Sequence, residues 1–338
     1  MEKTSFNRLV DMKFNLLKKG FSKDSIDIIS ASWRESTSRQ YQYAWKLWAT
    51  WCLSNDLDPL NSSVQDVLNF LSIQFKSGKS YSILNTYRSS ISSIHSKVNN
   101  TPIGQHELVI RFFKGLANLR PSIPRYSVTW DVDRVLLYLE SQGELDDLSL
   151  KMLTCRTVTL VSLVTAQRSQ TLKFLNLSNM KQDSSGITFS LDKLTKTDKP
   201  GHFRKLFIPC FKNKRLCVVT SINAYISKTR ILRKSNQLFV SFRKPHDAVT
   251  TSTLAKWIIF IMNLSGIDCS SFKAHSVRSA VTSKTVHKGF SVHELMKCGL
   301  WRTENTFKKF YLKDIKSKLS NEGYITKMAE TVLVLNRE

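Results

Sequence analysis

Apolar and polar positions alternate with a helical period along most of the chain. The clearest case runs from Ser38 to Cys52, where an aromatic and small apolar stripe recurs at steps of three and four residues. The stripe consists of Tyr41, Ala44, Trp45, Trp48, Ala49 and Cys52. This pattern predicts an amphipathic helix, and the three tryptophans Trp45, Trp48 and Trp51 are expected to pack in a core.

The same period predicts most of the remaining elements. Short amphipathic helices are expected at 5–19 and 23–33. A second long helix should start at Ser62 or Ser63, and a third within 80–98 should turn Ile83 or Leu84, Tyr87, Ile91 and Ile94 inward. Further helices are predicted at 106–119, 131–142, 149–166, 169–176, 218–232, 251–265, 274–288, 291–298 and 303–313.

One region changes to a period of two. Ile187, Phe189 and Leu191 alternate with polar residues, and Leu206 and Ile208 do so after a loop that contains Pro200 and Gly201. This predicts a β-hairpin with a long, lysine-rich loop. Upstream, the sequence RPSIPRYSVTW at 120–130 holds two prolines and predicts a linker between two domains.

Bulk composition bounds the class of protein. A chain of 338 residues is long enough for two domains. The longest apolar run, VTLVSLVTA at 158–166, is about half of the roughly 18 residues that span a bilayer, so it predicts a buried helix. The N-terminus has no apolar signal region, and the six cysteines show no metal-binding or disulfide spacing. We therefore expect an intracellular protein with reduced thiols.

The net charge points to a polyanionic partner. The formal charge is +25 with a pI near 9.9. Between Lys193 and Lys244 there are fourteen Lys or Arg residues against one acid, Asp198. Apolar residues are interleaved with these cations, which is typical of a folded surface rather than a basic tail. Nucleic acid is the first expected partner, and an anionic membrane is the second.

The sequence FKAHSVRSAVTS at 272–283 places His275 and Arg278 three residues apart. On a helix the two side chains share a face, and two cationic donors that point at one place suit a phosphate. Taken alone, however, the pair favours two unrelated polar residues on a solvated face, because such pairs are common by chance.

Four further stretches extend this pair into a recognisable set. VTAQRSQTL supplies Arg168 after an apolar helix, with Leu172 four residues on, and LTKTDKPG supplies Lys196 in the hairpin loop. CGLWRTENTF supplies Trp301, and FKKFYLKD supplies Tyr311. In order and spacing these residues resemble a tyrosine recombinase of the phage-integrase type. The resemblance runs from about 38 to 314, and the versions in eukaryotic mobile elements of the Crypton and DIRS/Ngaro kind are the most similar.

Two positions depart from the pattern of this family. Thr171 stands where many relatives have an acid. The slot nine residues after Trp301, where many relatives have the tyrosine, holds Phe310, and Tyr311 follows it. Phe307, Phe310 and Tyr311 also fit the inward face of a helix. Tyr311 is the expected nucleophile, and Tyr324 in NEGYITKM is the alternative.

The resemblance implies a mainly helical protein with two working domains. A helical extension at 1–34 is expected to precede a helical, SAM-like core-binding domain at 35–122. A mixed α/β tyrosine-recombinase catalytic domain with a small β-hairpin sheet is expected at 126–338. The resemblance also implies double-stranded DNA as the partner, a homotetramer on that DNA, a nuclear location, and no metal, ATP or other small-molecule cofactor.

Each matched residue has a role in this chemistry. The family implies that Tyr311 attacks a phosphodiester and forms a 3′-phosphotyrosyl link. Arg168 and Arg278 would stabilise the negative charge of the transition state, and Lys196 would protonate the leaving 5′-oxygen. His275 would move a proton or donate to a phosphate oxygen. Trp301 would close the site by packing or through its indole N–H.

Sequence-blind contacts with the DNA backbone are expected from other cations. We assign them to Arg39, Lys46, Arg88, Lys97, Lys193, Lys199 and Arg204. The helix within 80–98 would present His95 on the same polar face as Arg88 and Lys97. For the lysines of the basic block, an ordinary surface position is the competing interpretation.

Three other functions remain open from the sequence. The departure at Thr171 and the shifted tyrosine are also compatible with a domesticated relative that binds DNA without cleaving it. A type IB topoisomerase uses a similar set of residues, although the helical N-terminal module favours a recombinase. A basic helical protein that binds acidic partners or membranes would not require Arg168, Lys196, His275 and Arg278 to converge.

Overall fold

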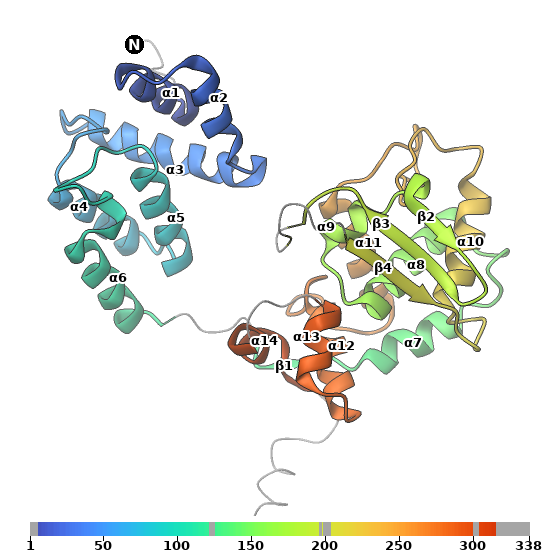
Figure 1. Cartoon of the computed structure of the whole chain (residues 1–338). Coiled ribbons are helices and arrows are strands. Elements are labelled where there is room, and N and C mark those ends of the chain that lie inside the picture. Colours follow the sequence, from blue (N-terminus) through green and yellow to red (C-terminus); the bar gives the residue numbers. More distant parts are fainter. Residues whose placement is uncertain (1–5, 122–125, 196–197, 199–203, 300–303, 316–338) are drawn as a thin grey trace, which may run out of the picture. The chain divides into compact units, whose positions relative to one another are not determined.

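The computed structural model of the chain describes residues 6–121, 126–195, 198, 204–299 and 304–315. It divides into two compact units, residues 1–123 and 124–338, and the boundary falls within the proline-containing segment 120–130. Both units are mainly helical, and all the named strands of the described part belong to the second (Figure 1). The structure therefore has the predicted class, mainly α with a small sheet.

The first unit is a helical assembly. Its elements are α1 (Arg8–Lys18), α2 (Lys23–Ala31), α3 (Glu35–Leu53), α4 (Val64–Lys76), α5 (Tyr81–Ser92), the 3₁₀ helix η1 (Ile103–Gln105) and α6 (Glu107–Leu119). The α-helices match the predicted ones, with ends shifted by a few residues, whereas η1 was not predicted. Ser63 is the N-cap of α4, because its hydroxyl accepts a hydrogen bond from the Asp66 amide while the Asp66 carboxylate accepts one from the Ser63 amide.

Tryptophans of α3 form the centre of this unit. Trp45 and Trp48 are fully buried, as the apolar stripe predicted, whereas Trp51 is only partly buried and packs against Phe70 at the edge. On α5 the inward position belongs to Leu84, and Ile83 is 42% exposed. The stripe therefore identifies the buried face of α3 except at its last aromatic residue.

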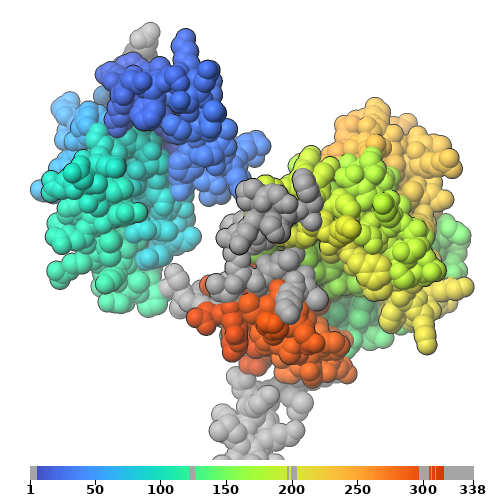
Figure 2. Space-filling view, in the orientation of Figure 1, coloured from blue at the N-terminus to red at the C-terminus, as the bar shows by residue number. Residues whose placement is uncertain are grey.

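The N-terminal helix α1 is part of the same packed unit. The buried guanidinium of Arg8 donates to the Ser93 hydroxyl at 3.2 Å and lies 4.8 Å from the ring centroid of Trp33. The indole of Trp45 donates to the Asp11 carboxylate at 2.6 Å. In the space-filling view the dark blue N-terminal helices cover one side of this unit (Figure 2). Residues 8–31 are therefore integrated with α3 and α5.

The second unit contains the sheet and the remaining helices. Its helices are α7 (Val132–Glu140), α8 (Leu150–Thr165), α9 (Ser169–Lys173), η2 (Leu177–Asn179), α10 (Val218–Thr229), α11 (Thr251–Leu264), α12 (Ser276–His287), α13 (Val292–Gly299) and α14 (Glu304–Tyr311). Its strands are β1 (Val128–Thr129), β2 (Met180–Gln182), β3 (Gly186–Leu191), β4 (Arg204–Pro209) and β5 (Asp314–Ile315).

Helix α8 is the centre of this unit. Every residue from Leu153 to Leu163 is buried, as the apolar run at 158–166 predicted for its first part, whereas Val164 near the end of that run is 51% exposed. Helices α10, α11 and α12 pack around α8, and the sheet lies against α8 and α10 (Figure 1). The buried residues of α8 include polar ones, and the guanidinium of Arg156 donates to the backbone carbonyl oxygens of Leu139 and Arg215.

The predicted hairpin is present as β3 and β4, with Ile187 opposite Ile208 and Phe189 opposite Leu206. Gly186 begins β3, where a Cβ atom would lie 2.2 Å from the carbonyl oxygen of Ile208, so the close strand approach requires glycine. The sheet has a third strand, β2, which was not predicted from the sequence. A parallel pair of β1 and β5 was also missed, and β1 lies inside the expected linker. Two-residue and three-residue strands are too short to show a period.

Among the described residues, no helix has both the length and the apolar character that crossing a bilayer requires. The cysteines that lie in the described ranges, Cys52, Cys155, Cys210, Cys217 and Cys269, are free thiols.

Candidate active site

The His275–Arg278 pair lies at the start of α12. His275 immediately precedes the helix and Arg278 is in its first turn, where the guanidinium is only 1% exposed. Between them, the Ser276 hydroxyl accepts a hydrogen bond of 2.8 Å from the buried indole of Trp130. This contact fixes the first turn of α12 to a residue 146 positions earlier.

Tyr311 meets this pair from α14. Its hydroxyl lies 3.2 Å from Nε2 of His275, and the guanidinium carbon of Arg278 lies 5.2 Å from the centroid of its ring. Tyr311 is 9% exposed and packs beside Phe307, whereas Phe310 is half exposed. The inward aromatic face of α14 therefore consists of Phe307 and Tyr311. The phenol is buried with its hydroxyl on a polar partner, and Phe310 lies on another face of the helix.

The backbone of Tyr311 is held by the same helix that carries Arg278. The hydroxyls of Thr282 and Ser283 both donate to the Tyr311 carbonyl oxygen, at 3.0 and 3.2 Å, and the Lys313 amide donates to Ser283 at 2.9 Å. Neither Thr282 nor Ser283 was predicted from the sequence. Their signal was the position of Thr282, one helical turn after Arg278, on a helix with many small hydroxyl residues.

Arg168 enters the site from the junction of α8 and α9. Helix α8 ends where Ala166 takes a left-handed conformation with φ of 47°, and Arg168 is then the N-cap residue of α9. Non-glycine residues rarely adopt this conformation, so the turn depends on the surrounding packing. Leu172 is in the core as the motif predicted. Thr171, which stands where many relatives have an acid, is also buried.

The electrostatics show that three arginines belong to one cluster. Burial and the positive charge of Arg168 lower the pKa of both Arg278 and Arg204. Arg204 also lowers the pKa of Arg278, whose value of about 10 still leaves it charged at pH 7. The fold holds these like charges close together despite their mutual repulsion. An anionic ligand would relieve this repulsion, so the cluster favours binding of an anion.

His275 is neutral in this cluster. Burial of the ring lowers its pKa from the ordinary 6.5, and the charges of Arg278 and Arg168 lower it further. Part of the His275 residue nevertheless remains accessible to solvent, so water screens part of the repulsion between the imidazole and these charges. Because even the ordinary pKa lies below 7, the imidazole is uncharged at pH 7 in either case. A neutral Nε2 without a proton can accept a hydrogen bond from the Tyr311 hydroxyl.

We expect an NMR titration of the DNA-free protein to show His275 titrating below the ordinary value of 6.5. Replacing Arg168 with Ala should raise this pKa, because the substitution removes one of the two positive charges that oppose protonation. The measurement follows the imidazole resonances with pH, and the His275→Gln variant identifies the signal. An unchanged titration in Arg168→Ala would show that Arg168 does not act on His275.

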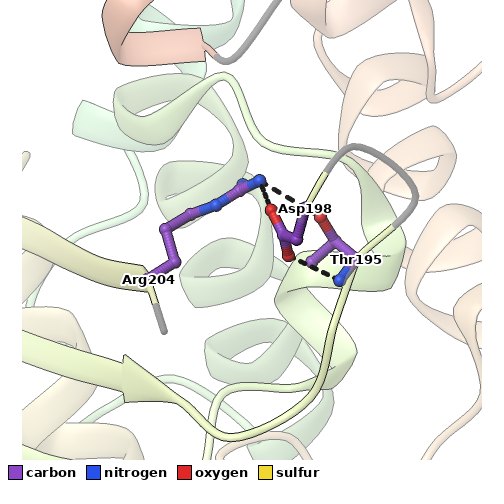
Figure 3. Close-up of polar contacts among 3 residues, drawn as sticks. All are labelled: Thr195, Asp198 and Arg204. Atoms are coloured by element: carbon purple, nitrogen blue, oxygen red, sulfur yellow. Dashed lines mark hydrogen bonds and ion pairs between the residues drawn. The ribbon is translucent and has the colours of Figure 1, made fainter. Parts of the chain in front are cut away.

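Arg204, predicted as a DNA-backbone contact, lies on β4 and forms an ion pair with Asp198 (Figure 3). Asp198 also accepts a hydrogen bond from the backbone amide of Thr195. In the sequence Asp198 stood out only as the single acid of the basic block, and no role was predicted for it.

Other predicted residues of this unit lie apart or outside the described part. Lys196, Lys199, Trp301 and the alternative nucleophile Tyr324 lie outside the described residues. Lys193 is exposed, and its ammonium lies 5.9 Å from the centroid of Phe174. Its position remains compatible with either a DNA contact or an ordinary surface role.

The predicted DNA-binding cations of the first unit are on its surface. Arg39 and Lys46 are exposed and lie on the same face of α3, because they are seven residues apart. Lys97 is exposed after the end of α5. Arg88 is half-buried, and its guanidinium lies 4.6 Å from the centroid of Phe113.

The expectation for His95 was wrong. His95 is 7% exposed, with Nδ1 at 2.7 Å from the carbonyl oxygen of Ser96 and Nε2 at 3.2 Å from the Ser62 hydroxyl. Burial lowers its pKa. A carbonyl oxygen can only accept a hydrogen bond, so Nδ1 of His95 carries the proton and donates to the Ser96 oxygen. Nε2 then accepts a hydrogen bond from the Ser62 hydroxyl. His95 is therefore a structural residue, because it is buried and both ring nitrogens are hydrogen-bonded within the protein. Helical spacing alone had placed it on the exposed face.

No cluster of three His, Cys, Asp or Glu side chains that could hold a metal ion occurs in the described ranges. What the site offers is a phenol in contact with a neutral imidazole and several guanidiniums. This arrangement suits nucleophilic attack on a phosphate whose charge grows during the reaction.

No known protein-family profile matches the chain, and no curated protein sequence matches it. Solved structures do match. The Tn1549 transposon integrase in complex with transposon right end DNA is 12% identical, with a TM-score of 0.56 over 96% of this chain and 99% of that one. The XerH site-specific recombinase bound to its palindromic difH substrate is 16% identical, with a TM-score of 0.53 over 82% and 73%.

A lambda integrase dimer bound to a COC′ core site is 15% identical, with a TM-score of 0.52 over 88% of this chain and 77% of that one. At these levels of identity the likeness concerns the fold. The fold of this chain is that of the tyrosine recombinases.

Proposed function

We propose that this protein is a site-specific DNA recombinase that breaks and rejoins DNA through a covalent 3′-phosphotyrosyl intermediate. One observation carries the proposal: the Tyr311 hydroxyl contacts His275 inside a cluster of arginines, although the residues come from separate parts of the chain. The fold and the +25 net charge support it. The similar structures named above were determined in complex with DNA.

In the proposed reaction the phenolic oxygen of Tyr311 attacks the phosphorus of one phosphodiester. The phenolic proton passes to Nε2 of the neutral His275, the new oxygen–phosphorus bond forms, and the bond from phosphorus to the 5′-oxygen breaks. Lys196 donates a proton to that oxygen and leaves a 5′-hydroxyl. Attack by a 5′-hydroxyl of a partner strand reverses these steps and joins the new strand to the 3′ end.

The arginines stabilise the transition state in this proposal. Negative charge grows on the non-bridging phosphate oxygens during attack, and fixed guanidiniums stabilise it without reorganisation. Arg278 is held rigidly because it is buried in the first turn of α12. Arg168 approaches from the turn between α8 and α9. The planar guanidinium of each arginine can donate two hydrogen bonds to two phosphate oxygens.

The test is covalent trapping on a duplex that carries a nick near the cleavage site. After cleavage the short fragment with the 5′-hydroxyl diffuses away, so the reverse step fails and the protein–DNA adduct accumulates. Candidate target sequences for this duplex are first selected from random DNA by their binding to the protein. An adduct at the 3′ side of the break supports the proposal. Gel shifts without any adduct would instead identify a DNA-binding relative without catalysis, and relaxation of plasmids without a defined site would identify a topoisomerase.

Assembly is part of the proposal. Exchange between two duplexes requires four cleavages, so we infer that four copies act together on DNA. A lambda integrase tetramer bound to a Holliday junction matches this chain with a TM-score of 0.51 at 13% identity. Analytical ultracentrifugation of the protein on paired target sites should give four protomers per two duplexes. One protomer per duplex at saturation would contradict this assembly.

The kind of recombinase is inferred from the sequence alone. We propose that it is of the kind found in eukaryotic mobile elements of the Crypton and DIRS/Ngaro type, and the extra residue between Trp301 and Tyr311 supports this. A protein of this kind would act on chromosomal DNA in the nucleus. A fluorescent fusion excluded from nuclei would contradict that location.

A further inference from the structure

Asp198 connects two parts of the hairpin region (Figure 3). Its carboxylate accepts a hydrogen bond of 2.6 Å from the backbone amide of Thr195 and forms an ion pair with the guanidinium of Arg204. The Asp198 amide donates in turn to the Thr195 carbonyl oxygen at 3.2 Å. Nη2 of Arg204 also lies 3.3 Å from the Thr195 hydroxyl. The three residues therefore form one closed set of contacts.

This set is shielded from solvent. The side chain of Asp198 is 6% exposed and that of Arg204 is 16% exposed, while Thr195 is buried. Exposed ion pairs contribute little, but a buried pair cannot lose one partner without leaving an uncompensated charge. Asp198 is also the only acid among the residues from 193 to 244. A buried carboxylate in such a basic segment is a specific contact and not an ordinary surface charge.

The set is joined to the candidate active site through Arg204. The charge of Arg168 lowers the pKa of Arg204, and the charge of Arg204 lowers the pKa of Arg278. At the other end, Thr195 and Asp198 are the described residues that flank Lys196 and Thr197 in the chain. The Asp198 carboxylate thus connects Thr195 with Arg204, which is the member of this set that acts on the arginine cluster.

From these contacts we propose that Asp198 is a positioning residue for the cleavage step: it fixes the segment that carries Lys196 relative to the arginines that bind the phosphate. The proposal rests on the proposed function, in which Lys196 protonates the leaving 5′-oxygen. Proton donation requires the ammonium within hydrogen-bond reach of that oxygen, and a small displacement of a catalytic group can lower a rate about 100-fold.

The test uses two DNA substrates that differ in one atom. In the first the leaving group is the ordinary 5′-oxygen, and in the second a 5′-bridging sulfur replaces it. A thiolate is a stable leaving group and needs no proton, so cleavage of the second substrate does not depend on a positioned acid. Single-turnover cleavage is measured on both substrates with the full-length wild type, Asp198→Asn and the control Asp192→Asn.

Asp198→Asn keeps an oxygen that can accept from the Thr195 amide but removes the charge that holds Arg204. We expect its cleavage of ordinary DNA to fall about 100-fold. On the sulfur-bridged DNA we expect a rate within about threefold of the wild type, because the acid is no longer needed. Asp192→Asn makes the same chemical change at an exposed position of the same hairpin and should match the wild type on both substrates.

Equal loss on both substrates would overturn the proposal, because it would show a general defect of the arginines or of folding. Wild-type rates of Asp198→Asn on ordinary DNA would overturn it as well. If Asp198→Asn does not fold, Asp198→Glu carries the same comparison, since it keeps the charge and displaces it by one methylene. A wild type that forms no adduct with either substrate would instead reject the proposed function, and the two failures are therefore distinguishable.

Discussion

Tyr311→Phe forms no covalent adduct with a nicked target duplex, whereas the wild type accumulates one; this is the expected result with the largest effect. The substitution removes only the hydroxyl that lies 3.2 Å from Nε2 of His275. The ring keeps its place beside Phe307 and beneath the guanidinium of Arg278. Because no oxygen remains to attack phosphorus, the loss is complete while the fold and the DNA affinity are retained. Denaturing gels measure the adduct and gel shifts measure the binding.

The matched control is Tyr324→Phe, which makes the same change at the alternative tyrosine. We expect it to form the adduct at the wild-type rate. The opposite outcome, with an adduct from Tyr311→Phe and none from Tyr324→Phe, would transfer the nucleophile to Tyr324. Peptide mapping of the wild-type adduct gives an independent assignment of the modified residue.

Arg278→Lys should lower the rate of single-turnover cleavage by about 10² to 10³-fold, which corresponds to the loss of one fixed donor at a developing oxyanion. Lysine keeps the positive charge but has a single ammonium in place of a planar fork. The lysine side chain is also shorter than that of arginine. At this buried position the packing around it prevents the backbone from moving to bring the ammonium closer to the phosphate. We expect the affinity for target DNA to change little, since many other cations contribute to it.

Arg230→Lys is the control for this comparison. Arg230 is exposed at the end of α10, and the same substitution there should leave cleavage unchanged. If Arg278→Lys weakened binding and cleavage to the same extent, Arg278 would contribute to DNA affinity in general and not to the transition state. A rate equal to that of the wild type would remove Arg278 from the proposed chemistry.

Long elements could be predicted because each contains several repeats of the helical or strand period. The stripe of α3 identified Trp45 and Trp48 as core residues, and the alternation in β3 and β4 gave the hairpin. The pair His275 and Arg278 was also accessible, because its spacing lies within one helical turn. By contrast, β2 and the β1–β5 pair contain too few residues to show any period, so the sequence predicted one hairpin and a linker in their place.

The contacts that support the candidate site could not be predicted, because they join residues far apart in the chain. Trp130 reaches Ser276 across 146 positions, and Thr282 reaches the Tyr311 carbonyl across 29. Periodicity describes which face of a helix is apolar, but it does not reveal which hydroxyl will meet which carbonyl. His95 shows the related error, because a polar residue next to an apolar stripe was turned inward by two hydrogen bonds.

Helix α12 carries Arg278 and, one turn later, the hydroxyls that hold the Tyr311 carbonyl. Because the acceptor is a backbone oxygen, the contact depends on a hydroxyl in the second turn of α12 and not on the side chains around the tyrosine. A graft of the C-terminal segment into a chain that lacks these hydroxyls should include residues 275–283 as well, or the transplanted phenol will lack its backbone anchor. The two stretches are best treated as a single inherited module.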